Sequence, residues 1–274
     1  MEATLAVPGD ARYHAIAFLG GRLHFIFVVD SKWVSKKLLP HFLSDDRSSA
    51  ALWSGVVYDS YRPYPDQLFK QIKAEFLQVF SRSSVLLDEE SERHLATMLV
   101  EATFVRTRRE RYITFSECRS ALQSMSESGR LSALWSTGHI LAKENGWASF
   151  GKSFFVKAWP RETVYRTSST TESLIRLATN LTDEFGDVVD VLEEYFTFVD
   201  HPDSYLFGLL QNGTKGKILA KWPGHVLTIL AKTIRTDAPY KPYQLEKVLE
   251  AIGDTDNSLR STRRWRALHN LLSQ

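Results

Sequence analysis

Apolar residues recur along much of the chain at the spacing of amphipathic helices. In the segment 65–81, Leu68, Ile72 and Phe76 follow one another at every fourth position, and the charged residues Lys70, Lys73 and Glu75 occupy other positions. This spacing places the apolar side chains on one helical face. The segment opens with a proline in the first turn and an aspartate at the positive end of the helix dipole. The pattern therefore predicts an amphipathic helix over residues 65–81.

Residues typical of helix N-termini mark the starts of further helices. Thr114 precedes Glu117, and Ser169 precedes Glu172, each at the spacing of a capping box. We therefore expect helices to begin after Thr114 and Ser169. The other predicted helices share the same apolar periodicity and cover residues 88–102, 185–198, 223–234, 242–252 and 258–272.

Short, turn-rich connections separate these helices, and such connections join antiparallel neighbours. The sequence thus predicts an all-α protein, an irregular α-solenoid or superhelix of antiparallel helical hairpins. A weak echo links Ala51–Gly55 with Ala133–Gly138, although it does not set a repeat length. We expect a single helical-repeat-like domain over residues 1–274, with two lobes, 1–125 and 126–274, as the alternative.

The run Phe25–Val29 fits this picture least well. Its aromatic and β-branched residues are typical of a buried strand. No partner strand is evident, however, and Lys36 and Lys37 follow within a helical pattern. Helix is therefore the preferred prediction for this run.

Composition and charge narrow the protein class further. Hydrophobic residues make up 43% and charged residues 24%, which is ordinary for a globular protein. The net charge of +2 gives no global basic field for nucleic acid. Cys118 is the single cysteine, so no internal disulfide can form. The first residues lack the basic start of a signal peptide, and the longest apolar run near the N-terminus is too short to span a bilayer. We expect a cytoplasmic protein.

One complete motif points to nucleotide chemistry. Residues 146–153 match the phosphate-binding pattern, with Gly146 and Gly151 as its glycines followed by Lys152 and Ser153. In such a loop, backbone N–H groups wrap the phosphates, the lysine reaches the β- and γ-phosphates, and the hydroxyl helps to hold magnesium. Asp30, after the apolar run described above, is the candidate metal-binding aspartate. A P-loop nucleotide-binding protein is therefore one alternative.

The sequence around this motif argues against it. A charged stretch precedes the loop where a buried strand should stand, Trp147 and Phe150 fill a loop that should be built from small residues, and Pro160 limits the following helix to about two turns. Asp30 also precedes the loop, the reverse of the usual order. We interpret the aromatic residues here as core side chains, namely Trp147, Phe150, Phe154 and Phe155.

Two clusters of arginine with aromatic residues are candidate partner-binding sites. The first comprises Arg106, Arg108, Arg109 and Arg111 beside Tyr112, and the second comprises Arg260, Arg263, Arg264 and Arg266 around Trp265. Such clusters can grip phosphates and stack on bases, so a nucleic-acid-binding helical protein is a second alternative. The simpler interpretation is that these cations complement helix C-termini.

Other chemistry is weakly represented. The eight histidines are scattered, none lies at metal-ligand spacing from Cys118, and we expect this thiol to be buried. The acidic pairs Asp45–Asp46 and Asp88–Glu89 stand where helix capping explains them. Among the tryptophans, we expect one group in the core, Trp53, Trp135, Trp159 and Trp222, and another nearer the surface, Trp33 and Trp265.

Several blocks together resemble a known family region. They are Trp33 with Leu38–Phe42, Ala50–Gly55, Leu68–Phe80, Trp147 with Phe154–Pro160, Pro223–Leu230 and Pro242–Leu249. Their order is similar to the uncharacterised helical region at the C-terminus of large bacterial proteins. Many of those proteins carry an N-terminal SIR2-like NAD-hydrolysing domain and are tied to antiphage defence.

The resemblance implies that any effector enzyme lies outside this chain and that the helices form a sensing or regulatory surface. It carries over no catalytic residue, because its shared positions are structural tryptophans and prolines. The preferred hypothesis is a non-catalytic interaction or regulatory module, the sensor or scaffold part of a bacterial antiphage defence system. It would bind a protein partner or an attached effector domain and use no cofactor and no metal.

Overall fold

A computed structural model describes residues 5–59, 64–105, 111–144, 146–210, 216–237 and 241–273. Helices dominate these residues, and none of the described segments is a β-strand, so the predicted all-α class is confirmed. The chain divides into two compact units, Met1–Ala133 and Leu134–Gln274. The boundary falls within helix α10 (Glu127–Glu144), whereas the alternative with two lobes places it after Met125.

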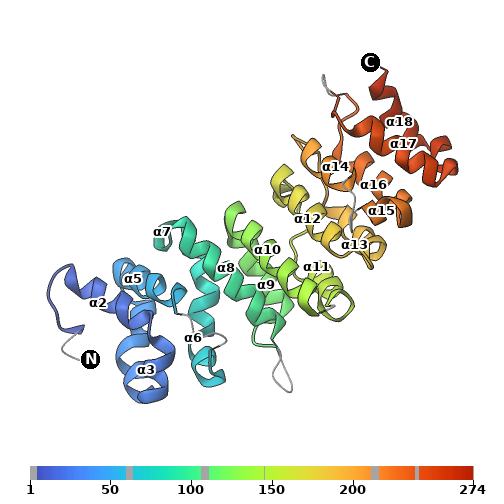
Figure 1. Cartoon of the computed structure of the whole chain (residues 1–274). Coiled ribbons are helices and arrows are strands. Elements are labelled where there is room, and N and C mark those ends of the chain that lie inside the picture. Colours follow the sequence, from blue (N-terminus) through green and yellow to red (C-terminus); the bar gives the residue numbers. More distant parts are fainter. Residues whose placement is uncertain are drawn as a thin grey trace. The chain divides into compact units, whose positions relative to one another are not determined.

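The first unit is built from short helices that contact neighbours close in sequence (Figure 1). Its α-helices are α2 (Ala11–Gly20), α3 (Leu23–Val29), α4 (Ser31–Trp33), α5 (Asp46–Val57), α6 (Asp66–Val79), α7 (Ser83–Leu86), α8 (Glu89–Phe104) and α9 (Phe115–Ser124). A π-helical turn, η1 (Val34–Leu38), and two 3₁₀ turns, η2 (Leu39–Leu43) and η3 (Phe80–Arg82), connect them.

The second unit follows the same plan after helix α10. Its α-helices are α11 (Lys152–Lys157), α12 (Ser168–Asn180), α13 (Phe185–Leu192), α14 (Asp203–Leu210), α15 (Gly216–Lys221), α16 (Pro223–Thr233), α17 (Leu245–Thr255) and α18 (Arg263–Leu272). A π-helical turn, η4 (Trp147–Gly151), and three 3₁₀ turns, η5 (Thr163–Tyr165), η6 (Glu193–Tyr195) and η7 (Asn257–Ser261), complete it.

Helices α2 and α5 pack so closely that their backbones nearly touch. A Cβ atom on Gly55 would lie 2.0 Å from the carbonyl oxygen of Ala17, so only glycine fits there. Close to this contact, the buried ring of Trp53 packs 4.4 Å from the ring of Phe42 and 6.1 Å from that of Phe76. This aromatic group forms part of the core of the first unit.

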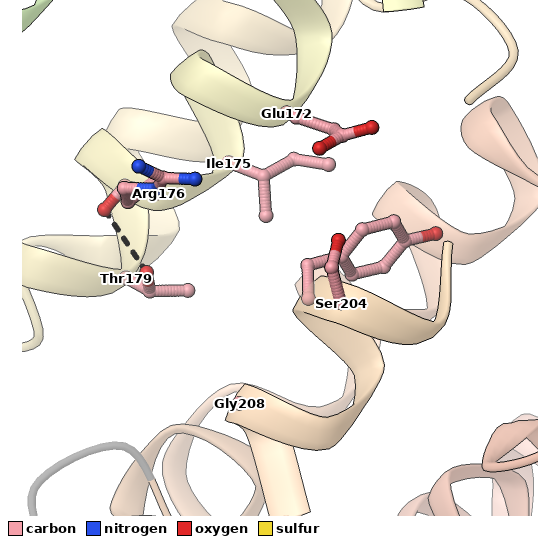
Figure 2. Close-up of a pocket in the computed structure, with 7 residues that line it drawn as sticks. Glu172, Ile175, Arg176, Thr179, Ser204 and Gly208 are labelled. Carbon is pink, nitrogen blue, oxygen red and sulfur yellow. Dashed lines mark hydrogen bonds between the residues drawn. The ribbon is translucent and has the colours of Figure 1, made fainter. Parts of the chain in front are cut away.

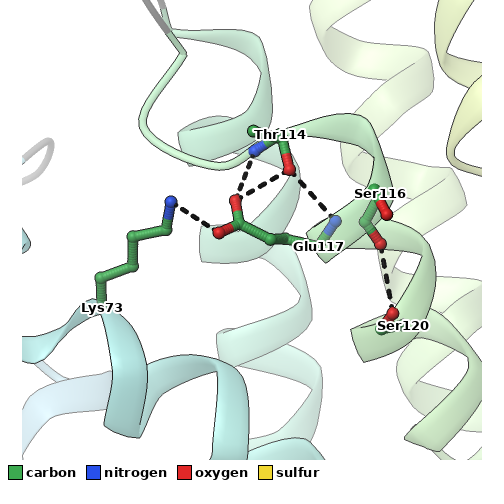
Figure 3. Close-up of polar contacts among 5 residues, drawn as sticks. All are labelled: Lys73, Thr114, Ser116, Glu117 and Ser120. Carbon is green, nitrogen blue, oxygen red and sulfur yellow. Dashed lines mark hydrogen bonds and ion pairs between the residues drawn. The ribbon is translucent and has the colours of Figure 1, made fainter.

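The capping box predicted at Thr114 is present and is tied to a second helix (Figure 3). The backbone N–H of Glu117 donates to Oγ1 of Thr114 at 3.2 Å, and the N–H of Thr114 donates to Oε2 of Glu117 at 2.8 Å. The other carboxylate oxygen, Oε1, lies 2.9 Å from Nζ of Lys73 on helix α6. Burial disfavours the charged carboxylate, but the Lys73 ion pair and the Thr114 hydrogen bonds outweigh it, so the pKa of Glu117 is lowered.

Two buried charges satisfy helix ends farther along the first unit. The carboxylate of Glu92 accepts hydrogen bonds from the backbone N–H and the hydroxyl of Ser126, immediately before helix α10. The guanidinium of Arg130 donates to the carbonyl of Met125, which follows the C-terminus of helix α9. Both side chains sit where helix dipoles favour their charge, so these polar contacts stabilise the junction between α9 and α10.

Several predicted helix starts need correction. The N-cap of α12 is Thr167, whose Oγ1 accepts the N–H of Thr170 at 3.1 Å, because the backbone leaves the extended conformation at Thr167 and Ser169 is already helical. Pro65 is itself an N-cap. Pro223 lies in the first turn of α16 as predicted. Pro242, in contrast, precedes α17, and its carbonyl oxygen accepts the N–H of Leu245 in a turn.

The tryptophans divide differently from the prediction. Trp53 and Trp159 are buried as expected. The prediction for Trp135 was wrong, since its side chain is 62% exposed on α10 and contacts the ring of His139. Trp135 and Trp53 thus occupy different environments, and the sequence echo between their blocks is not a structural equivalence. Trp222 is only half-buried and covers Gly186.

Candidate interaction surfaces and the phosphate-loop motif

The phosphate-loop motif is folded as helix, not as a loop. Gly146 precedes the π-helical turn η4, and its carbonyl accepts the N–H groups of Phe150 and Gly151 at 2.8 and 3.0 Å. The N–H of Lys152 donates to the carbonyl of Trp147. These are N–H groups that a phosphate cradle would have to offer to its ligand. They are already used within the helix.

The motif lysine is held by an ion pair within the same unit. Nζ of Lys152 lies 2.7 Å from Oδ1 of Asp187 on α13, and Nε1 of Trp147 donates to the other oxygen, Oδ2, at 2.7 Å. The hydrogen bond from Lys152 is the main reason that the pKa of Asp187 is lowered, and the bond from Trp147 adds to it. Lys152 therefore anchors the motif to α13 through a carboxylate.

The second motif glycine has a packing role. A Cβ atom on Gly151 would lie 2.6 Å from Cε3 of Trp147 and 2.9 Å from Cδ1 of Leu141. Trp147 and Phe150 are both buried, and Phe154 packs 5.3 Å from the ring of Phe150. The interpretation of these aromatic side chains as core residues is confirmed, and Gly151 is needed so that they can pack.

The remaining parts of the motif also lack the expected setting. Helix α11, which carries Lys152 and Ser153, is only six residues long. Asp30 belongs to the first unit, where its side chain accepts the N–H of Trp33 at 2.9 Å and caps helix α4. Helix capping therefore explains Asp30 without a metal ion.

The first arginine cluster is described only in part. Arg106, Arg108 and Arg109 lie outside the described residues. The guanidinium of Arg111 donates to the carbonyl oxygens of Thr103 and Phe104 at 2.7 and 3.2 Å, in the last turn of α8. It also lies 4.6 Å from the centre of the Phe115 ring. Arg111 thus caps the C-terminus of helix α8, which ends before it in the sequence.

The second arginine cluster lies on and just before α18. Arg264 donates to Oγ1 of Thr228 at 2.8 Å, and the half-buried ring of Trp265 stacks on His269 at 4.6 Å. Arg260 pairs with Asp254 at 2.9 Å. Arg263, Arg264 and Arg266 are exposed, and a role of this cluster, Trp265 included, in partner binding stays a prediction.

A small groove separates helices α12 and α14 (Figure 2). Glu172 and Arg176 are separated by one turn of α12, and across the groove Tyr205 of α14 hydrogen-bonds Oγ1 of Thr233 at 2.6 Å. Its volume of about 90 Å³ is small beside the roughly 300–1,000 Å³ of ordinary ligand pockets. The groove offers opposite charges but no nucleophile and base in contact.

Other reactive chemistry is also limited. Cys118 is buried, and desolvation raises the pKa of its thiol to about 12, so it stays protonated at neutral pH. Among the described residues, no group of three His, Cys, Asp or Glu side chains is placed to hold a metal ion. Within the same ranges, no helix is long and apolar enough to cross a membrane.

The sequence analysis missed an exposed apolar face on helix α3. The preferred helix over Phe25–Val29 is present, and Ile26 and Phe27 are buried within the first unit. The side chains of Phe25, Val28 and Val29, however, are 63%, 68% and 64% exposed. We call these three residues the α3 outer face. A uniformly apolar run gives no indication of which half of a helix faces outward, so the pattern could not reveal this face.

In comparisons with known proteins, the chain matches no family model, no curated protein and no solved structure.

Proposed function

We propose that this chain is a non-catalytic helical interaction module, the sensor or scaffold part of a bacterial antiphage defence system that works in the cytoplasm. Its enzymatic effector would lie outside these residues. The resemblance of its tryptophan and proline blocks to the helical regions of SIR2-like defence proteins supports this assignment. An irregular superhelix of helical hairpins, as the sequence predicts, would supply the extended surface that such a module uses.

The α3 outer face is the observation that carries the proposal. A helix that is apolar on all sides is normally buried on all sides. Helix α3 is apolar throughout, apart from His24, yet only its inner half packs against the first unit. Covering Phe25, Val28 and Val29 would gain on the order of 1–2 kcal/mol for each side chain. A protein partner is the natural source of such a cover.

Nucleotide binding is the competing function, and the motif geometry opposes it. Its backbone N–H groups and its lysine already have partners within the second unit. Isothermal titration of the intact chain with ATP, with and without magnesium, separates the two functions. We expect no heat of binding for the natural chain or for Lys152→Ala. Micromolar binding that Lys152→Ala abolishes would overturn the proposal.

A further inference from the structure

We propose that the α3 outer face docks an acidic amphipathic helix of a partner protein. Phe25, Val28 and Val29 would be the apolar anchors, and Arg22 and Lys32 would face carboxylates along the edge of the bound helix. This inference rests on the proposed function and deepens it by assigning a surface and a class of partner.

The anchors are spaced and held as a helix-binding surface requires. Residues separated by three and four positions lie on one helical face, so Phe25, Val28 and Val29 form one contiguous strip. Their helix is fixed from the inside by buried Ile26 and Phe27, and at its start by the N–H of His24, which donates to Asp59 at 3.1 Å. Because the strip is already helical before a partner binds, little backbone conformational freedom is lost when a partner covers it.

The charge around the strip selects an acidic partner. Residues 11–38 contain five lysines and arginines, whereas Asp30 is their only acidic residue. Asp30 is already engaged as the cap of α4. The side chains of Arg22, Lys32 and Lys36, which precede α3 or lie on elements that contact it, are exposed. An apolar strip with a basic edge is complementary to a helix with apolar anchors and glutamates beside them.

Two other occupants fit this charge pattern less well. In a two-fold dimer, the strip of one copy would cover the strip of the other. Arg22 and Lys32 of the two copies would then lie close together, and like charges repel. A membrane surface would also attract lysine and arginine, but a helix of seven residues inserts few apolar side chains, and the strip has no tryptophan among them. A helical protein segment meets both the size and the charge of the strip.

A designed peptide provides the test with the intact chain. The probe is a fluorescein-labelled helical peptide of about 18 residues, or five turns, with leucines at every third and fourth position and glutamates beside them. A matched peptide carries lysine in place of each glutamate. Fluorescence anisotropy should show saturable binding of the acidic peptide and at least about tenfold weaker binding of the basic one.

The binding should depend on the strip and its basic edge. Phe25→Ala combined with Val29→Ala should weaken binding of the acidic peptide at least about tenfold, and Arg22→Glu with Lys32→Glu should do the same. Val164→Ala, an exposed apolar position in the second unit, should leave it unchanged. All substituted side chains are exposed, and an unchanged thermal midpoint checks that each variant is folded.

Three outcomes would overturn this inference. The first is equal binding of the acidic and basic peptides, or binding of the acidic peptide by the strip variants that is as tight as its binding by the natural chain. The second is co-sedimentation with phosphatidylglycerol vesicles that Phe25→Ala abolishes, without peptide binding. The third is a dimer in sedimentation velocity that Phe25→Ala dissociates. None of these involves ATP, so they leave the nucleotide test of the proposed function independent.

Discussion

The ammonium group of Lys152 lies 2.7 Å from the carboxylate of Asp187, 35 residues farther along the chain. The same carboxylate accepts the indole N–H of Trp147. One aspartate on α13 therefore holds both ends of the helical turn into which the phosphate-loop motif has folded. This contact gives the lysine of the motif a structural role. The motif can therefore be tested by measuring the stability of variants as well as their nucleotide binding.

The two partners in this contact should differ in their importance for stability. Lys152→Met removes a half-exposed ion pair and should lower the free energy of unfolding by less than about 1 kcal/mol after allowance for solvent screening. Asp187→Ala also deprives the indole N–H of buried Trp147 of its partner and should cost about 1–3 kcal/mol. Urea unfolding followed by circular dichroism measures both. A larger loss for Lys152→Met than for Asp187→Ala would contradict this account.

Gly151 provides a second test of the structural role. Gly151→Ala places a Cβ against Trp147 and Leu141, and the overpacked core should lose about 1–3 kcal/mol. Gly208→Ala on α14 is the matched control, because among the described residues no atom beyond its chain neighbours and its own helix backbone lies within 4 Å of its Cβ position, and alanine favours helix by up to about 1 kcal/mol. Thermal unfolding of both variants measures the two changes in stability. If Gly151→Ala is as stable as the natural chain, the packing role is wrong.

The Glu117 contact predicts a specific pH dependence. The pKa of Glu117 is lower in the folded chain than its ordinary value of 4.5. Its stabilising effect is therefore complete above that value and is lost as the pH falls through the folded-state pKa. Glu117→Gln should cost about 1 kcal/mol at pH 7, a figure that allows for the partial exposure of the Lys73 pair. Unfolding free energies of the two proteins should converge as the pH is lowered from 5 toward 3. A difference that stays constant over this range would exclude the charge effect.

Much of the fold could be predicted because its determinants are local. The periodicity of Leu68, Ile72 and Phe76 and the Thr114 capping box act within one or two helical turns, and both appear in the structure. Boundaries were less certain where neighbouring residues offered equivalent caps, as with Thr167 and Ser169. The predicted burial of Trp135 was wrong, because the identity of a residue as tryptophan does not determine which face of a helix packs against the core.

The two tryptophans of the sequence echo should therefore respond differently to substitution. Trp53→Ala removes a buried ring from an aromatic cluster and should destabilise the first unit by about 3–5 kcal/mol. Trp135→Ala removes an exposed ring and should cost less than about 1 kcal/mol. Chemical unfolding of both variants measures the difference. Similar losses would mean that Trp135 is covered in solution.

The candidate surfaces were harder to predict than the fold, since they depend on contacts between residues distant in sequence. The Lys152–Asp187 ion pair joins two helices, and no local sequence pattern predicts it. Arg111 was expected in a partner-binding cluster, and in the structure it caps the C-terminus of the preceding helix α8. The α3 outer face was hidden because every residue from Phe25 to Val29 is apolar, so the hydrophobic pattern contained no contrast between the inner and outer halves.

Photo-crosslinking in the cells that encode the chain tests the interaction function most directly. A benzophenone amino acid would replace Phe25, and a control chain would carry it at Val164, which is exposed in the second unit. We predict a discrete covalent adduct with one protein from position 25 and none of that size from position 164. Mass spectrometry should place the crosslink in an acidic helical segment of that protein. No adduct at position 25, or the same adducts from both positions, would contradict the assignment of this chain as an interaction module that acts through helix α3.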